Sequence, residues 1–138
     1  MTQDSVSPLM FIRPWTTLRR PEPGREYVAL LSELWLDSVR TMPAFFSYSG
    51  RIQGQLKRSP GLIGFSMNAH VFRKKFWTLS VWESAEAIAL FVHEKPHRDI
   101  MAALQGKIRN PRFIQWRISG FQCPPSWAHA FRMREEGL

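Results

Sequence analysis

The stretch that decides the fold is Phe76-Trp77-Thr78-Leu79-Ser80-Val81-Trp82-Glu83-Ser84. Successive side chains of an extended chain point to opposite sides, and this stretch is rich in aromatic and β-branched residues, so it predicts a β-strand. Ser84 suits the N-cap of a following helix, because its hydroxyl can accept a hydrogen bond from a first-turn N–H group. Glu86 would then lie in the first turn, where the helix dipole favours negative charge.

The helix after this strand is expected in two pieces. Pro96 has no N–H group and disfavours helical geometry at the residue before it. The pattern therefore predicts helices over about 85–93 and about 96–107. Apolar residues recur at spacings of three and four in both pieces and form one stripe, which consists of Ile88, Phe91, Val92, Ile100, Met101, Leu104 and Ile108.

Further strands and helices are expected before and after this strand and its broken helix in the sequence. Apolar and alternating runs predict strands at 27–36, 62–72 and 112–119. Pro43 suits the first turn of a helix, which would extend to about residue 58. The order strand, helix, strand, strand, helix, strand, with right-handed crossovers, gives a ferredoxin-like α+β fold. This βαββαβ unit would have a four-stranded antiparallel sheet with both helices on one face.

The ferredoxin-like domain would occupy residues 26–119. Residues 1–25 hold four of the ten prolines of the chain, so we expect an extended N-terminal arm there. Residues 120–138 are expected to form a C-terminal tail, in which Ser126 caps a short helix.

The predicted sheet has two apolar faces and helices for only one of them. In the strand at 27–36, Leu30 and Leu34 fall on one face, and Leu31 and Trp35 fall on the other. A face this apolar is costly to leave in water. Pairing with an identical sheet would cover it, so we expect a homodimer through the sheet face that points away from the helices.

The composition narrows the possible partners. The formal net charge is +8, but Lys and Arg are scattered, and no helix-turn-helix spacing or RNA-binding signature is present, so no nucleic-acid partner is expected. No apolar run reaches the roughly 18 residues of a membrane helix, and no signal-peptide pattern precedes the first strand. Cys123 is the single cysteine, which excludes an internal disulfide. We therefore expect a cytoplasmic protein without a membrane partner.

The segment from Thr78 to Ser84, followed by Ala87 and by Pro96-His97, resembles the dimeric α+β barrel superfamily. Within it, the chain is most similar to antibiotic biosynthesis monooxygenase-like proteins and a related domain family of unknown function. The shared pattern is an aromatic-acidic strand end, an alanine-rich helix start and a small-residue–x–His break, in which Pro96 here replaces the usual residue before the His. The resemblance covers about residues 26–119.

This resemblance implies an oxygenase that works without a cofactor on an apolar or aromatic small molecule. In such enzymes the substrate carbanion itself reduces oxygen, so the protein supplies a base, a dry pocket and polar anchors. The haem-degrading branch of the superfamily instead uses an Asn on the first strand and a Trp and a His on the second helix. Aligned at Trp82, this chain has Phe91 and Met101 at the two helix positions, and residues 27–36 contain no Asn.

His97 is the candidate catalytic residue. A His at a helix break can reach the cavity between helices and sheet, and its pKa lets it act as acid or base near neutral pH. The alternative is a structural His that hydrogen-bonds a backbone carbonyl exposed by Pro96. His93 lies four residues earlier, as two metal ligands on a helix do, but Pro96 intervenes and no third ligand is near in sequence, so no metal site is expected.

Five residues are candidates for binding the substrate. Trp82 and Phe91 could shape a flat aromatic pocket, although aromatic residues on strands more often belong to the core. Asn68 and His70 share the mixed face of the strand at 62–72 and would line the pocket only if that face meets the helices. His93 completes the set.

Three functions stay open at this point. The first is a small-molecule-binding protein that acts as a cofactor-independent monooxygenase. The second is a non-catalytic ligand-binding or interaction domain. The third is a haem-binding protein with His97 or His93 as axial ligand.

Overall fold

The computed structural model describes residues 10–136, with side chains described from residue 13 onward. The first nine residues of the predicted arm and the last two of the predicted tail lie outside the described residues. The elements are β1 (Met10–Thr17), β2 (Glu26–Leu36), α2 (Met42–Arg58), β3 (Leu62–His70), β4 (Lys75–Trp82), α3 (Ala85–His93), α4 (His97–Ala103), β5 (Ile108–Ser119) and α5 (Trp127–Glu136). Short 3₁₀ turns lie at Val39–Thr41, Val71–Arg73 and Gly120–Gln122.

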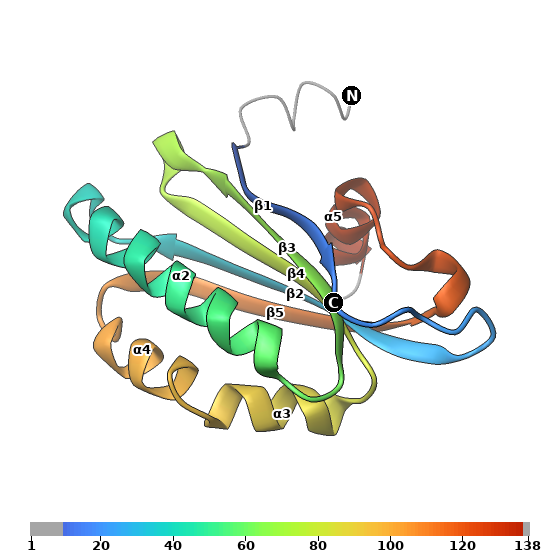
Figure 1. Ribbon diagram of the computed structural model, residues 1–138. Coiled ribbons are helices and arrows are strands. Elements are labelled where there is room, and N and C mark those ends of the chain that lie inside the picture. The colour runs from blue at the N-terminus through green and yellow to red at the C-terminus, as the bar shows by residue number, and fades with distance from the viewer. Residues whose placement is uncertain (1–9, 137–138) are drawn as a thin grey trace.

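All the described strands belong to one antiparallel sheet with the order β1-β3-β4-β2-β5 (Figure 1). Its inner part, β3-β4-β2-β5 with α2 after β2 and α3–α4 after β4, is the predicted ferredoxin-like arrangement, so the fold prediction is confirmed. The predicted strand count of four is wrong, because β1 adds a fifth strand along β3. The division into a domain at 26–119 with flanking segments stays a prediction.

The extra strand comes from the proline-rich arm. β1 lies at the edge of the sheet, where Pro14 need not donate a ladder hydrogen bond, and its pairing with β3 shifts register on both sides of Arg13. Gly64 lets this strand approach closely, because a Cβ atom there would lie 2.6 Å from the Trp15 ring. The prolines led to the prediction of an extended arm. That prediction overlooked that an edge strand tolerates proline.

Several boundaries differ from those expected. β3 ends at His70, because the chain turns at Val71–Arg73 and Lys74 takes a left-handed conformation with φ of 58°. β5 begins at Ile108 and continues through Asn110 and Pro111, which the sequence placed before the strand. α3 has the predicted bounds, and α4 is shorter than predicted. The Ser84 hydroxyl caps α3 as expected, accepting from the Ala87 N–H group at 3.2 Å.

Helices α2, α3 and α4 cover one face of the sheet, here called the front face (Figure 1). The side chains that pack together on this side come from alternate positions of the strands and from the inner sides of α2 and α3. They are Leu30, Leu56, Leu62, Phe65, Met67, Trp82, Ile88 and Phe91.

The opposite face, here called the back face, is covered by α5. Ala130 on α5 is fully buried, and Trp127, Phe131 and Met133 pack against the sheet beside it. The sheet contributes Tyr27, Ala29, Leu31, Ile63, Trp77, Leu79, Val81, Ile114, Trp116 and Ile118, all of them buried. The expectation that this face stays bare in a single chain is therefore wrong: the tail folds back over it.

A buried ion cluster fixes the end of α5 to the back face. Glu33 on β2 is 2% exposed and accepts two hydrogen bonds from the Arg134 guanidinium, one of them 2.9 Å long. Trp77 Nε1 donates to the same carboxylate at 2.8 Å, and Lys75 Nζ lies 3.8 Å from it. Burial raises the pKa of Glu33, but these hydrogen bonds and charges outweigh burial and leave the pKa below its usual value.

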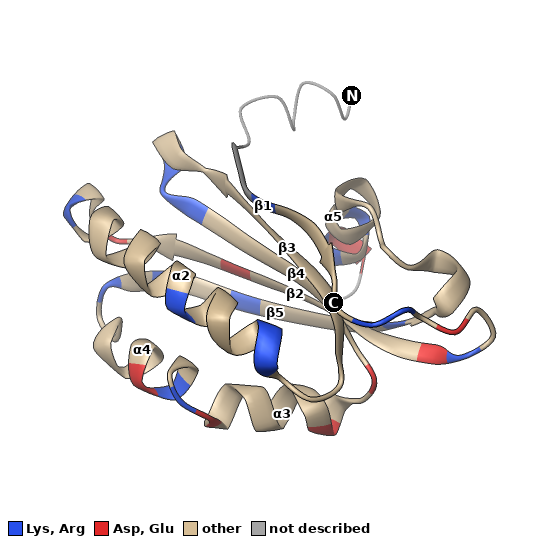
Figure 2. Cartoon of the chain, viewed as in Figure 1, with Lys and Arg blue, Asp and Glu red and all other residues tan. Residues whose placement is uncertain are grey.

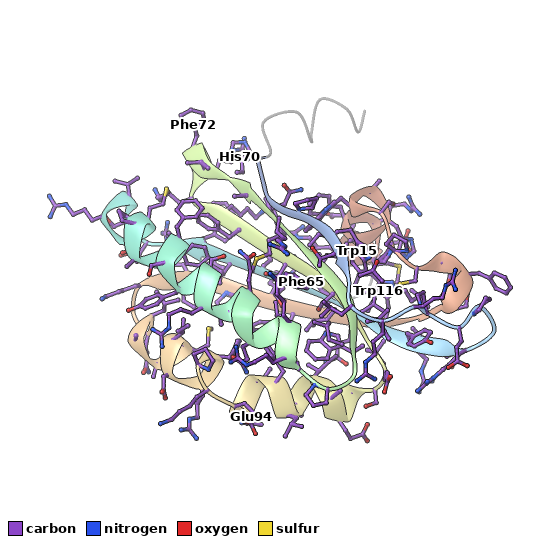
Figure 3. All side chains as sticks on the ribbon, in the orientation of Figure 1. Trp15, Phe65, His70, Phe72, Glu94 and Trp116 are labelled. Carbon is purple, nitrogen blue, oxygen red and sulfur yellow. The ribbon has the colours of Figure 1, made fainter. Side chains whose placement is uncertain are left out.

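Charged residues are spread over the described surface, and most elements carry Lys or Arg (Figure 2). Several large apolar side chains are exposed as well, and Phe72, in the turn between β3 and β4, is 93% exposed and points away from the body (Figure 3). No described helix has the length and apolar character needed to cross a membrane.

Candidate functional site

A cavity of about 110 Å³ lies between the front face of the sheet and helices α2, α3 and α4. Its wall is mostly apolar, with Leu30, Met67 and Trp82 from the sheet and Ile52, Phe91 and Ile100 from the helices. Phe113 on β5 is 59% exposed and lines the cavity as well, so the cavity reaches the surface beside the edge strand. The cavity is thus a mostly apolar chamber with an opening.

Three hydroxyl groups lie on the sheet side of the cavity. Ser32 on β2 and Thr78 on β4 are directly paired across the strands, and both line the cavity. Ser80 also lines it, but its hydroxyl already accepts a hydrogen bond from Trp82 Nε1 at 2.8 Å. Ser32 and Thr78 are therefore the hydroxyl groups on the sheet best placed to bind a polar group of a ligand.

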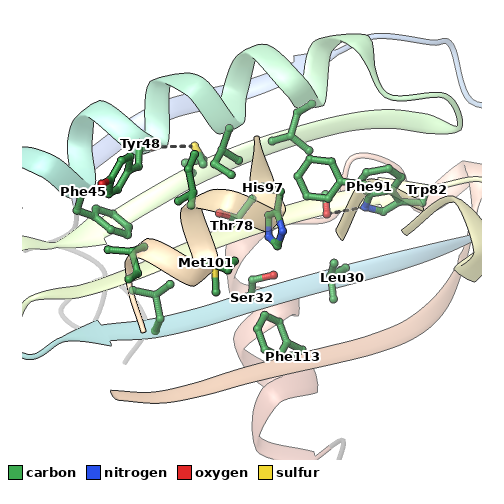
Figure 4. A pocket seen from close by; sticks show the side chains of 18 residues that line it. Leu30, Ser32, Phe45, Tyr48, Thr78, Trp82, Phe91, His97, Met101 and Phe113 are labelled. Atoms are coloured by element: carbon green, nitrogen blue, oxygen red, sulfur yellow. Dashed lines mark hydrogen bonds between the residues drawn. The ribbon is translucent and has the colours of Figure 1, made fainter. Parts of the chain in front are cut away.

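His97 is the first residue of α4 and lines the cavity above these strands (Figure 4). Its Nδ1 atom lies 3.1 Å from the Val92 carbonyl oxygen. A carbonyl oxygen can only accept, so Nδ1 carries a proton, and in the neutral ring Nε2 is then the basic atom. Burial lowers the pKa of His97 below its usual 6.5, and the hydrogen bond to Val92 only partly offsets this. His97 is thus a neutral base at pH 7.

Trp82, Phe91 and His97 form a continuous row of rings along one wall. The ring centroids of Trp82 and Phe91 are 5.4 Å apart, and those of Phe91 and His97 are 4.9 Å apart. Trp82 is 1% exposed and Phe91 is 8% exposed, so both belong to the core as well as to the cavity wall. The row holds the imidazole against an apolar surface, which is the cause of its desolvation.

The structure brings three predicted site residues together, namely Trp82, Phe91 and His97. It separates the other three from them. Asn68 and His70 lie on the back face, because the mixed side of β3 turned out to point away from α2, α3 and α4. His93 is exposed at the end of α3 and does not line the cavity.

Asn68 and His70 have a different environment from the one expected. Asn68 is fully buried, and neither polar atom of its side chain has a hydrogen-bond partner among the described residues. His70 lines a second, polar cavity of about 320 Å³ together with Glu33, Lys75 and Arg134. This second cavity adjoins the cluster that holds α5 in place.

Sequence reasoning missed the polar residues of the cavity. Ser32, Thr78 and Tyr48 line it, and none of them was predicted as a site residue. A signal for Ser32 was present, because it is a hydroxyl residue between Leu30 and Leu34 on an otherwise apolar strand face. Among the described residues, no cluster of three or more His, Cys, Asp or Glu side chains has the geometry to hold a metal ion.

The chain was compared with known protein families, sequences and structures. No family model matches the sequence, and no curated protein sequence is significantly similar to it. Solved structures do match. The heme-degrading enzyme LmHde from Listeria monocytogenes is 14% identical with a TM-score of 0.59, over 78% of this chain and 68% of that one.

Two further matches are an oxygenase and a relative of monooxygenases. SnoaB, a cofactor-independent oxygenase from Streptomyces nogalater, is 14% identical with a TM-score of 0.52, over 72% of this chain and 98% of that one. An uncharacterized ferredoxin fold protein related to antibiotic biosynthesis monooxygenases, from Listeria monocytogenes, is 14% identical with a TM-score of 0.53, over 64% of this chain and 54% of that one. At these identities the likeness establishes the fold: the chain has the ferredoxin-like fold found among proteins related to antibiotic biosynthesis monooxygenases.

Proposed function

We propose that this protein binds a small apolar or aromatic molecule in the front-face cavity and that His97 acts on it as a general base, as in an oxygenase that needs no cofactor. The observation that carries the proposal is the state of His97: a neutral imidazole in an apolar wall, with Nδ1–H held by Val92 and Nε2 left as the basic atom. Nε2 would take a proton from an acidic O–H or C–H group, and the resulting anion would reduce oxygen. Ser32 and Thr78 would anchor a ligand oxygen.

The cavity volume limits the ligand. An apolar cavity of roughly 150 Å³ accepts one benzene ring, and this one measures about 110 Å³. A single small ring therefore fits with minor adjustment, whereas a fused-ring substrate would have to displace side chains such as Phe113 at the opening. We therefore propose a small ligand. A larger ligand would bind only if the opening widened.

The test is oxygen consumption with a panel of electron-rich phenols and hydroquinones. We expect uptake by the wild type, loss of uptake in His97→Ala and His97→Gln, and little change in their thermal midpoints. His93→Gln is the matched control, because His93 is exposed on the same helical region and does not line the cavity. Wild-type rates in both His97 variants would overturn the catalytic role. Early unfolding of both with unchanged ligand binding would leave His97 a structural residue.

A non-catalytic ligand-binding domain is the second candidate, and the small cavity favours it. For such a domain, the wild type should bind single-ring phenols without consuming oxygen. A haem-binding role has less support, because a haem macrocycle is much larger than the cavity. A visible absorption spectrum tests it: a Soret band in the purified protein would support haem, and an unshifted Soret band after incubation with haemin would exclude it.

A homodimer and a cytoplasmic location are part of the same proposal. The dimer was expected because the back face would be bare; α5 covers that face within one chain, so a partner would have to dock over α5 or displace it. Sedimentation velocity at micromolar concentration tests this, and a stable monomer would contradict it. The single cysteine supports a reducing compartment, and fractionation of cells tests it.

A further inference from the structure

Gln55 on α2 is a buried polar side chain that touches both pieces of the broken helix. It is 5% exposed. Its Nε2 donates to the carbonyl oxygen of Phe91, near the end of α3, at 2.9 Å. Its Oε1 accepts from the backbone N–H of His97, the first residue of α4, at 2.7 Å. One amide group therefore joins α2, α3 and α4.

The second of these bonds supplies a helix cap that the local sequence cannot provide. The first N–H groups of a helix have no partner within the helix. At α3 this need is met locally, by the Ser84 hydroxyl. At α4 the N-cap residue is Pro96, which makes no side-chain cap hydrogen bond. Gln55 lies on α2, 42 residues away in sequence, and its side chain caps α4 instead.

The cap also defines where the His97 ring lies. Gln55 fixes the backbone of His97, and the Val92 carbonyl fixes its Nδ1 atom at 3.1 Å. Phe91, whose carbonyl accepts from Gln55, packs its ring against the imidazole at 4.9 Å. Without the two hydrogen bonds of the Gln55 amide, the start of α4 could move relative to α3, and the imidazole could lose its contacts with Val92 and Phe91.

We propose that Gln55 is the positioning residue of this site. Its amide holds His97 so that Nδ1–H stays on Val92 and Nε2 remains the basic atom. The proposal rests on the proposed function for its consequence in catalysis, but the effect on the His97 ring can be measured without any substrate. The hydrogen bonds of the Gln55 amide go to backbone groups of Phe91 and His97, so its role is to hold the base in place and not to react.

The test is NMR of the full chain labelled with 15N-histidine, which reports the tautomer and the pKa of each imidazole. His97 is assigned from the signal that His97→Gln removes, and His93 serves as an exposed internal reference. In the wild type we expect a single tautomer with the proton on Nδ1 and a pKa below the usual 6.5. In Gln55→Met, which has a similar length and no amide, we expect a mixture of tautomers and a pKa that moves back toward 6.5.

Gln53→Met is the matched control. Gln53 lies on the same helix, is partly buried and makes no side-chain hydrogen bond with any described residue. It should leave the His97 signals at their wild-type positions. A folded Gln55→Met protein with the wild-type tautomer and pKa at His97 would overturn the proposal.

A second measurement needs no variant and covers the case in which Gln55→Met does not fold. If Gln55 caps α4, the amide hydrogen of His97 exchanges with solvent more slowly than an unprotected amide, although it is the first in its helix. Exchange at the unprotected rate would overturn the proposal.

The two proposals fail in different ways. A changed His97 tautomer in Gln55→Met, together with wild-type oxygen uptake in His97→Gln, would refute the catalytic role and leave the positioning role standing. Reduced oxygen uptake in Gln55→Met with an unchanged tautomer and pKa would refute the positioning role and leave His97 as the base.

Discussion

The sheet carries apolar side chains on both faces, and the two faces are covered in different ways. On the front face, α2, α3 and α4 leave an apolar cavity of about 110 Å³ with His97 in its wall. On the back face, α5 packs directly on the sheet, and Leu31, Leu79, Val81 and Ala130 are all 0% exposed. The polar groups differ as well: the front face has a neutral base and hydroxyl groups, whereas the back face has an ion cluster whose charges are paired with one another.

The titratable groups on the two faces therefore have different electrostatic environments. His97 has lost solvent without gaining a counter-charge, so burial lowers its pKa and leaves a base. Glu33 has lost even more solvent but is matched by Arg134, Trp77 and Lys75, so its pKa falls below the usual value and it stays a carboxylate. A partly buried group with a shifted pKa and no charged partner is the better candidate for function.

Trp82→Ala should have the largest effect on stability of the changes considered. Trp82 is 1% exposed, donates to Ser80 and packs on Phe91, so its removal should lower the free energy of unfolding by about 3–5 kcal/mol. Denaturation in guanidinium chloride measures this loss. A loss below about 1 kcal/mol would show that the ring lies in open space and that the front face is more hollow than described.

Arg134→Met tests the cluster on the back face. It leaves the Glu33 carboxylate buried without its main partner, which should cost about 3 kcal/mol at pH 7. Because the folded pKa of Glu33 is lowered, its stabilising contribution is present above the unfolded value of 4.5 and is lost as the pH falls through the folded pKa. The difference between wild type and variant should therefore shrink below pH 4.5.

The control for this change is Arg132→Met. Arg132 is exposed on the same helix, and its guanidinium lies 3.2 Å from the His129 ring rather than beside a buried carboxylate. It should change stability by less than about 0.5 kcal/mol. A loss at Arg132 equal to that at Arg134 would mean that helix α5 as a whole, and not the buried pair, is sensitive to the substitution.

His97→Gln should change the pH dependence of stability by a smaller amount. The folded pKa of His97 is below 6.5, so in the wild type the unfolded chain binds the proton more readily, and stability falls as the pH drops from 6.5 toward the folded pKa. The variant should lack this step, whereas His93→Gln should keep it. Urea midpoints across this pH range measure it, and identical profiles for wild type and His97→Gln would refute the lowered pKa.

Phe72→Ser should have the smallest effect. The side chain is 93% exposed, so its loss should change the free energy of unfolding by no more than about 0.5 kcal/mol. Chemical denaturation at two protein concentrations measures this. A larger loss that depends on concentration would show that a second copy of the chain covers Phe72 in solution.

Sequence periodicity was enough to predict the elements around the site. The alternation in residues 76–84, the Ser84 cap and the Pro96 break predicted β4, α3 and the second helix piece, and α3 has the predicted bounds. These features are local, because a strand pattern, a cap and a helix break each depend on neighbouring residues. They also placed Trp82, Phe91 and His97 on elements that could meet.

Long-range contacts decided the rest. From the sequence, either face of β3 could have met the helices. Only the folded chain shows that its mixed side lies on the back face with α5, so Asn68 and His70 are not in the cavity. The covering of the back face depends on Arg134 reaching Glu33 across 101 residues, and the cap of α4 depends on Gln55 reaching His97 across 42. The sequence by itself determined the order of the ferredoxin-like elements from β2 to β5 and the helix break at Pro96. The tertiary structure decided which face is hollow, what covers the other and which atom of His97 is basic, because each of these depends on partners that only folding brings together.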